Sequence, residues 1–276
     1  MQTVYVGNTL INDVMLGSQR MDDVLQNIVF VPTDQAAINF INATGITDNT
    51  IKQSINTLVV DLKANNLWNK LYVLYPFVGG TQDTNKYNLV NTGSYTISFN
   101  GPWTYNNNGI TGNGTSTYAD TGYSGSVSTW YTSGSLFNYS RTTGRSGYDM
   151  GVNDSAAGEY YLINRLTNDL TYLNLAVTPS TVASTDGSGL FMGNSRTSTQ
   201  TVYRNGSQII NVSKTTGQNP TIPFYLGANN FQNISAGDNT NRNYALGGFG
   251  QSFNGTEAST FYTIVQNFQT SLNRQV

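Results

Sequence analysis

Residues 201–210 (TVYRNGSQII) carry a strong local signal, because two short runs of β-branched and aromatic residues flank the pair Asn205-Gly206. An Asn-Gly pair accepts the positive φ angles that both central positions of a tight hairpin turn require, so the segment predicts a β-hairpin with a two-residue turn. Residues 223–230 (PFYLGANN) follow as an apolar strand that ends in a polar loop, and residues 244–250 (YALGGFG) as a further apolar run. We therefore expect β-structure at this end of the chain.

The chain closes with a predicted amphipathic helix. Asn254 can accept hydrogen bonds from the amides of the first turn while Glu257 reaches back to it, which is a capping-box arrangement. Apolar residues then recur at helical spacing and form one face: Ala258, Phe261, Tyr262, Val265, Phe268 and Leu272.

This order of motifs (the Asn-Gly hairpin, YLGA, YALGGFG, NGTEASTFYTIVQNF) resembles the closing strands of laminin-G and concanavalin-A-like jelly-roll domains. It is most similar to the version carried by virion proteins of tailed phages, and LWNKLYVLYPFVGGT at 67–81 extends the resemblance. The resemblance implies a mainly β fold, with a concanavalin-A-like (laminin-G-like) sandwich over residues 71–276. It also implies a fibre, receptor-binding or decoration protein on the outer surface of a virion.

Composition favours the same class of protein. The chain of 276 residues has no Cys, no His, 10% charged residues, and 18 Tyr against 3 Trp. Such a neutral composition is typical of β-rich extracellular or virion surface proteins. A net charge of −2 does not provide the positive charge that binding to nucleic acid or an anionic membrane requires. No basic apolar leader and no long apolar run occur, so we expect neither a signal peptide nor a membrane span.

Residues 1–30 form a predicted β-arm with a ten-residue repeat, in which 4–13 and 14–23 share one pattern of an apolar triplet, Gly with a small polar residue, and a closing Asn/Asp-Asp pair. Two such units bury too little surface to fold alone, so the arm needs a partner. That partner is its own main domain, sister chains (a trimer being favoured), another virion protein or a host surface. The expected attachment residues are Val4, Val6, Leu10, Ile11, Val14, Leu16, Met21 and Val24.

Residues 31–70 are predicted to form a helical connector. Thr33 or Asp34 can cap a helix through about Ile41, and residues 47–49 open a stronger one. The apolar stripe of this second helix is Ile51, Ile55, Leu58, Val59 and Leu62. The stripe suits docking on the chain's own domain, although contact with neighbouring subunits also fits.

Between residues 87 and 193, short strands alternate with Gly/Asn/Ser/Thr loops, which is typical of a sandwich. The predicted strands are 95–99, 118–120, 127–131, 136–139, 148–152, 160–166, 170–177 and 188–193.

Enzyme chemistry is largely excluded, and we expect no catalytic residues. Without His or Cys there is no Ser-His-Asp or Cys-His system and no zinc site of the usual kind. A glycan hydrolase needs two carboxylates about 5–9 Å apart. Glu257 serves as a cap and Glu159 has no acidic neighbour two residues away, so an Asp pair such as Asp149 and Asp154 is the alternative left open.

A binding role fits better, because glycan sites on sandwich rims combine aromatic platforms with amide, carboxylate and guanidinium groups. The candidate residues are Asn229, Asn230, Asn241, Arg242, Arg196, Trp103 and Tyr123. The competing interpretation is that the Asn residues serve turns and the aromatic residues serve the core. No cofactor is expected, apart from a Ca²⁺ candidate at Asp186, since laminin-G-type domains often hold this ion near their rim.

Three functional hypotheses follow. The preferred one is a homo-oligomeric virion appendage that is attached through its arm and displays a jelly roll for a host glycan. The alternative is a non-viral secreted or surface glycan-binding module. A glycan hydrolase comes third.

Overall fold

The computed structural model describes residues 4–6, 9–11, 30–125, 129–175, 179–214 and 217–276. The chain divides into two compact units, residues 1–31 and 32–276. In the first unit, β1 (Val4–Val6) pairs antiparallel with β2 (Thr9–Ile11), so the first repeat forms two short strands as predicted. Val14, Leu16 and Met21 of the second repeat, and Val24 after it, lie outside the described residues.

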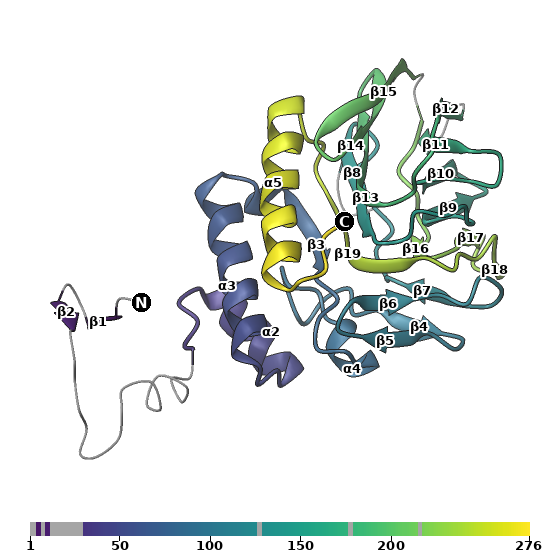
Figure 1. Cartoon of the computed structure of the whole chain (residues 1–276). Coiled ribbons are helices and arrows are strands. Elements are labelled where there is room, and N and C mark those ends of the chain that lie inside the picture. The colour runs from purple at the N-terminus through teal and green to yellow at the C-terminus, as the bar shows by residue number, and fades with distance from the viewer. Residues whose placement is uncertain (1–3, 7–8, 12–29, 126–128, 176–178, 215–216) are drawn as a thin grey trace. The chain divides into compact units, whose positions relative to one another are not determined.

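The second unit consists of two sheets and a layer of helices (Figure 1). The eight-stranded sheet, which we call the inner sheet, comprises β3 (Leu71–Tyr75), β5 (Thr104–Asn106), β6 (Gly109–Thr111), β8 (Ser133–Ser140), β13 (Gly189–Arg196), β14 (Thr199–Arg204), β15 (Ser207–Ser213) and β19 (Asn243–Gly250). The nine-stranded outer sheet comprises β4 (Ser98–Asn100), β7 (Tyr118–Asp120), β9 (Met150–Asp154), β10 (Gly158–Ile163), β11 (Leu170–Leu175), β12 (Ser180–Ala183), β16 (Tyr225–Leu226), β17 (Asn229–Phe231) and β18 (Ser235–Gly237). Within the described strands the pairings are antiparallel, except that β17 runs parallel to β9.

The predicted Asn-Gly hairpin is confirmed. Asn205 and Gly206 join β14 to β15 with φ angles of 49° and 77°. Both values are positive, which explains why this dipeptide occupies the turn.

The helices begin where the sequence places their caps, although the first continues past its predicted end near Ile41. Asp34 caps α2 (Gln35–Thr44) by accepting from the amide of Ala36, and Gly45 ends the helix in the left-handed conformation. Asp48 caps α3 (Asn49–Ala64) by accepting from the amide of Ile51. Shorter helical turns occur at η1 (Trp68–Lys70) and α4 (Gln82–Asn85).

The last helix, α5 (Gly255–Ser271), has the predicted capping box. The side chain of Asn254 accepts from the amide of Glu257 at 2.9 Å, and Glu257 Oε2 accepts from the amide of Asn254 at 2.8 Å. Each bond satisfies a helix-start amide that has no partner inside the helix.

Two apolar cores hold the layers together. Between the sheets, side chains such as Leu136 and Phe249 of the inner sheet meet Val152 and Leu162 of the outer sheet. On its other face, the inner sheet packs against α2, α3 and α5 through a second core. Helix residues of this second core include Phe40, Leu58, Leu62, Phe261 and Val265. Residues 32–70 are thus one layer of the same unit as the sandwich.

Some strand predictions need correction. Residues 129–132 form a turn and not a strand, because the amides of Thr132 and Ser133 both donate to the carbonyl of Thr129 and the Trp130 indole packs against Gly134. The strand predicted at 95–99 begins only at Ser98, since Tyr95 has a φ of 55° that interrupts extended backbone. No helix in the described part of the chain is long and apolar enough to cross a membrane.

Candidate functional site

The candidate site lies on the face of the outer sheet that points away from the inner sheet. Side chains alternate between the two faces of a strand. Those that enter the sandwich core from this sheet include Leu173, Tyr160, Val152, Leu226 and Ala119. Their chain neighbours therefore point outward, and directly opposed residues form a continuous row across six strands: Asn174, Tyr161, Gly151, Tyr225, Asp120 and Ser98. No helix of residues 32–276 covers this face, because the helical layer packs on the inner sheet (Figure 1).

Tyrosines dominate this outward face. We define the tyrosine row as Tyr118, Tyr148, Tyr161, Tyr172 and Tyr225. The rings of Tyr118 and Tyr225 stack with centroids 4.6 Å apart, and those of Tyr148 and Tyr161 meet edge to face at 4.9 Å. Tyr118, Tyr148 and Tyr172 are partly exposed, whereas Tyr161 and Tyr225 are buried against their neighbours. The row thus combines anchored rings with rings that solvent reaches.

Amide and carboxylate groups lie among these rings. Glu159 Oε1 accepts from Asn153 Nδ2 at 2.7 Å, and Asn168 Nδ2 donates to the hydroxyl of Tyr172 at 2.6 Å. Asp120 lies directly opposite Tyr225 and accepts from the amide of Gly122. Hydrogen-bonding groups are therefore fixed beside the aromatic faces.

The hydroxyls of Tyr148 and Tyr225 stay protonated at neutral pH. Burial and the nearby charge of Asp120 raise the pKa of Tyr225 to about 12. Burial and the charges of Asp238 and Glu159 raise the pKa of Tyr148 to about 12. Each hydroxyl can therefore donate as well as accept a hydrogen bond.

Of the predicted binding residues, Asn229 lies on this face. It pairs with Gly151, which lies between Tyr161 and Tyr225 in the sheet. Its side chain lies over the outward side of Gly151, because a Cβ added there would be 2.8 Å from Asn229 Oδ1. Asn229 is buried and its Oδ1 accepts no hydrogen bond from a described residue. Asn230, also buried, instead donates to the carbonyl of Pro223 and the side chain of Asn233.

The structure does not bring the other predicted residues to this face. Trp103 and Tyr123 belong to the sandwich core, with 7% and 0% of their surface exposed. Neither forms the exposed aromatic platform that we expected, because Tyr123 stacks on Phe249 and Trp103 donates to the carbonyl of Tyr118. Asn241 is exposed in a loop and accepts from Ser146 Oγ. Arg196, at the end of β13, is half-buried near Glu257.

Arg242 is a buried structural cation. Its Nε lies 2.8 Å from Asp149 Oδ1, outside hydrogen-bond geometry, and both side chains are fully buried. The guanidinium donates to the carbonyls of Thr142, Gly144 and Arg165, while Asp149 also accepts from Tyr244. Burial raises the pKa of Asp149, and Arg242 opposes this shift.

The remaining carboxylates of interest already have partners. Asp154, the second acid of the pair considered for hydrolysis, is buried and accepts from the amide and hydroxyl of Thr221. Asp186, the calcium candidate, accepts from Ser188 and lies 2.8 Å from the guanidinium of Arg204. Among the described residues, no group of three or more acidic side chains could hold a metal ion.

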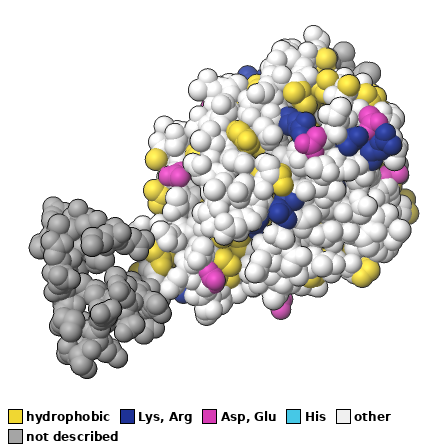
Figure 2. All heavy atoms as spheres, viewed as in Figure 1, with side chains coloured by type: hydrophobic (Ala, Val, Ile, Leu, Met, Phe, Trp, Pro, Cys, Tyr) yellow, Lys and Arg dark blue, Asp and Glu magenta, His cyan; other side chains and the backbone are white. Residues whose placement is uncertain are grey.

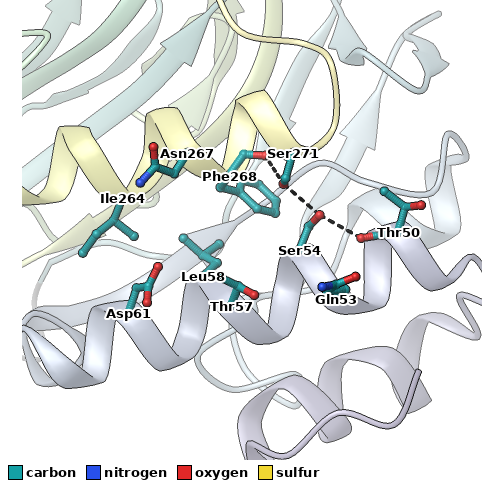
Figure 3. Close-up of a pocket in the computed structure, with 10 residues that line it drawn as sticks. All are labelled: Thr50, Gln53, Ser54, Thr57, Leu58, Asp61, Ile264, Asn267, Phe268 and Ser271. Atoms are coloured by element: carbon teal, nitrogen blue, oxygen red, sulfur yellow. Dashed lines mark hydrogen bonds between the residues drawn. The ribbon is translucent and has the colours of Figure 1, made fainter. Parts of the chain in front are cut away.

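A groove lies between α3 and α5 on the helical layer (Figure 3). It has a volume of about 240 Å³ and is lined by Thr50, Gln53, Ser54, Thr57, Leu58, Asp61, Ile264, Asn267, Phe268 and Ser271. Ser271 Oγ donates to Ser54 Oγ at 2.8 Å and joins the two helices at one end. Phe268 is the groove's one aromatic side chain, and it is buried in the core between the helices and the inner sheet. We therefore place the candidate site on the outer sheet.

Comparisons with known proteins support the fold. No protein-family model matches the chain, and no curated protein matches it. A structure of botulinum neurotoxin type C, described as depending on two ganglioside molecules for cell entry, is similar with a TM-score of 0.51 at 14% identity. That match covers 74% of this chain and 53% of the toxin chain. Trypanosoma rangeli sialidase, bound to a difluorinated keto-deoxy sugar acid, also gives a TM-score of 0.51, at 12% identity, covering 76% of this chain and 39% of the sialidase.

A third similar structure is domain 4 of an extracellular arabinanase from Geobacillus stearothermophilus, in complex with arabinotriose. It has a TM-score of 0.47 and 15% identity, and the match covers 70% of this chain and 98% of that domain. At such identities the likeness shows the fold alone: the second unit is a jelly-roll β-sandwich. The chain spans about half of the toxin and less of the sialidase.

Proposed function

We propose that this protein is a glycan-binding module and that the tyrosine row is its binding surface. One observation carries the proposal: three partly exposed tyrosines lie with fixed amides and carboxylates on a sheet face that no helix of the second unit covers. Sugar rings present apolar C–H faces and a rim of hydroxyls, which match aromatic faces with hydrogen-bonding groups beside them. The fold is shared with a neurotoxin whose cell entry is described as dependent on two ganglioside molecules and with a sialidase bound to a sugar acid, which agrees with this proposal.

Substitution within the row tests the proposal. Glycan-array screening followed by calorimetry would compare the intact protein with Tyr118→Ala and Tyr172→Ala. We expect each change to weaken binding about tenfold, because a stacked ring contributes roughly 1–1.5 kcal/mol.

Tyr118→Phe and Tyr172→Phe keep the ring and should retain most of the affinity. Tyr262→Ala, on α5 in the helical layer, is the matched control and should bind normally. Binding that survives both alanine changes would place the site elsewhere.

We also propose that the N-terminal arm attaches the protein to other chains. Its first repeat forms a two-stranded pairing within a unit separate from residues 32–276. Removing residues 1–31 should convert an oligomer into a monomer with an intact sandwich, as measured by light scattering and circular dichroism. A full-length protein that is already monomeric would refute self-association. The phage-virion hypothesis has no support from the comparisons, and immunogold labelling of purified particles would test it.

A further inference from the structure

Three carboxylates near the tyrosine row lie outside the described ion pairs. On the face seen in Figure 2, charged side chains are sparse and several of opposite sign lie side by side. Ion pairs of the described residues engage the carboxylates of Asp34, Asp83, Asp149, Asp169, Asp186 and Glu257. None of these pairs includes Asp120, Glu159 or Asp238.

Those three carboxylates surround the row. Asp120 lies opposite Tyr225 in the sheet, and Glu159 lies on β10 two residues before Tyr161 on the same face. The carbonyl of Asp238 accepts from the amide of Tyr148, which holds this exposed acid beside the row. The negative charges of these acids act on Tyr225, Tyr161 and Tyr148.

Two arginines near one end of the row share one carboxylate. Arg145 and Arg165, near the end of β10, both pair with Asp169. The row therefore has a negative field along its length, which repels anions and attracts cations at the distances of direct contact.

We propose that the tyrosine row selects glycans that carry free amino groups and disfavours glycans that carry carboxylate or sulfate. This inference rests on the proposed function, because it specifies the ligand of the same surface. A protonated hexosamine amine would lie on a ring face and donate hydrogen bonds to Asp120, Glu159 or Asp238. Neutral glycans would keep the stacking and lose the ionic contact, whereas sialylated, sulfated or uronic-acid glycans would meet like charge.

The test is an array that presents neutral, aminated and anionic glycans to the full chain, followed by calorimetry with the best aminated ligand and its N-acetylated counterpart. We expect the aminated ligand to bind about two- to fivefold more tightly for each carboxylate it meets, since an exposed ion pair contributes up to about 1 kcal/mol. This preference should shrink as salt is raised from 50 to 500 mM, because salt screens exposed charges.

Isosteric variants isolate the three carboxylates. Asp120→Asn, Glu159→Gln and Asp238→Asn keep the shape of each side chain, and the triple variant should bind aminated and acetylated ligands equally. Asp61→Asn is the matched control, because Asp61 is a half-exposed carboxylate outside every described ion pair and lies on α3.

Two results would overturn the inference while leaving the proposed function intact. One is equal binding of neutral and aminated glycans by the unchanged protein, and the other is anionic glycans among the tightest ligands. If no glycan of any charge binds, the proposed function itself fails and this inference falls with it.

Discussion

Lys214 shows how a single buried side chain can make stability depend on pH. Its ammonium donates to the carbonyl of Tyr131 at 2.6 Å and to Ser195 Oγ, and it lies 3.5 Å from the centroid of the Tyr131 ring. No carboxylate is among these partners. Burial lowers the pKa of Lys214 to about 8.

The sign of the pH effect follows from that shift. The folded pKa lies below the ordinary value for lysine, so the unfolded chain binds more protons between about pH 8 and pH 10. The free energy of unfolding should therefore rise by about 1.5 kcal/mol from pH 8 to 9.5, relative to Lys214→Met measured in parallel by urea denaturation. If the free energies of unfolding of the unchanged protein and Lys214→Met changed with pH in parallel, the buried state of this amine would be contradicted.

The Asp149–Arg242 pair gives a second prediction at the scale of single residues. Asp149→Asn would leave the guanidinium of Arg242 buried without an opposite charge. We expect a loss of about 3–5 kcal/mol in the free energy of unfolding. The double variant Asp149→Asn with Arg242→Met should recover part of that loss, and a smaller loss in the single variant than in the double variant would contradict the account.

At the scale of elements, the helix caps were predictable because they depend on residues close in the sequence. Asn254→Ala removes the side chain that accepts from the amide of Glu257 and should cost about 1 kcal/mol. Asn254→Asp retains an acceptor and should be near neutral. Thermal denaturation of both variants checks this prediction. An equal loss of stability in the two variants would show that the side-chain hydrogen bond of the cap contributes little.

The strands show where local reasoning stops. The Asn205-Gly206 turn and the strand at 118–120 follow from short-range patterns, and both are confirmed. Trp130 lies in a strand-like run of residues, yet it is in a turn because its indole packs against Gly134. Such tertiary packing overrides propensity and leaves no local signature.

The tyrosine row could not be predicted from the sequence for a related reason. Tyr118, Tyr161 and Tyr225 are far apart in the chain and meet only through the register of β7, β10 and β16 with the strands between them. Trp103 and Tyr123 looked equally suitable, but the alternation of their strands and loops directs them into the core. Of the residues predicted for binding, Asn229 lies on this face, whereas none of the five tyrosines of the row was predicted.

At the scale of the whole molecule, the three layers give the two sheets unequal roles. The inner sheet packs on both faces, against the helices and against the outer sheet. The outer sheet packs on one face only, against the inner sheet, and no helix of the second unit covers its other face. The proposed recognition surface and the supporting helices thus lie on opposite sides of one sandwich.

Arg274, two residues before the last described position, joins distant parts of this body. Its buried guanidinium donates to the carbonyls of Pro76, Phe77 and Ala245 and to the side chain of Gln269. Arg274→Met would leave three buried carbonyls without this donor and should cost about 3 kcal/mol or more, measurable by chemical denaturation. Arg274→Lys keeps the charge but has fewer donors, so its stability should lie between those of the unchanged protein and Arg274→Met. An unchanged denaturation midpoint for Arg274→Met would show that water replaces the guanidinium.

The position of this arginine has a consequence for biosynthesis. The carbonyls of Pro76 and Phe77 emerge from the ribosome nearly two hundred residues before the guanidinium that satisfies them. This closing contact can form only once residue 274 has been synthesised and has left the ribosome. Until then, the sandwich that precedes it stays incompletely sealed at these carbonyls.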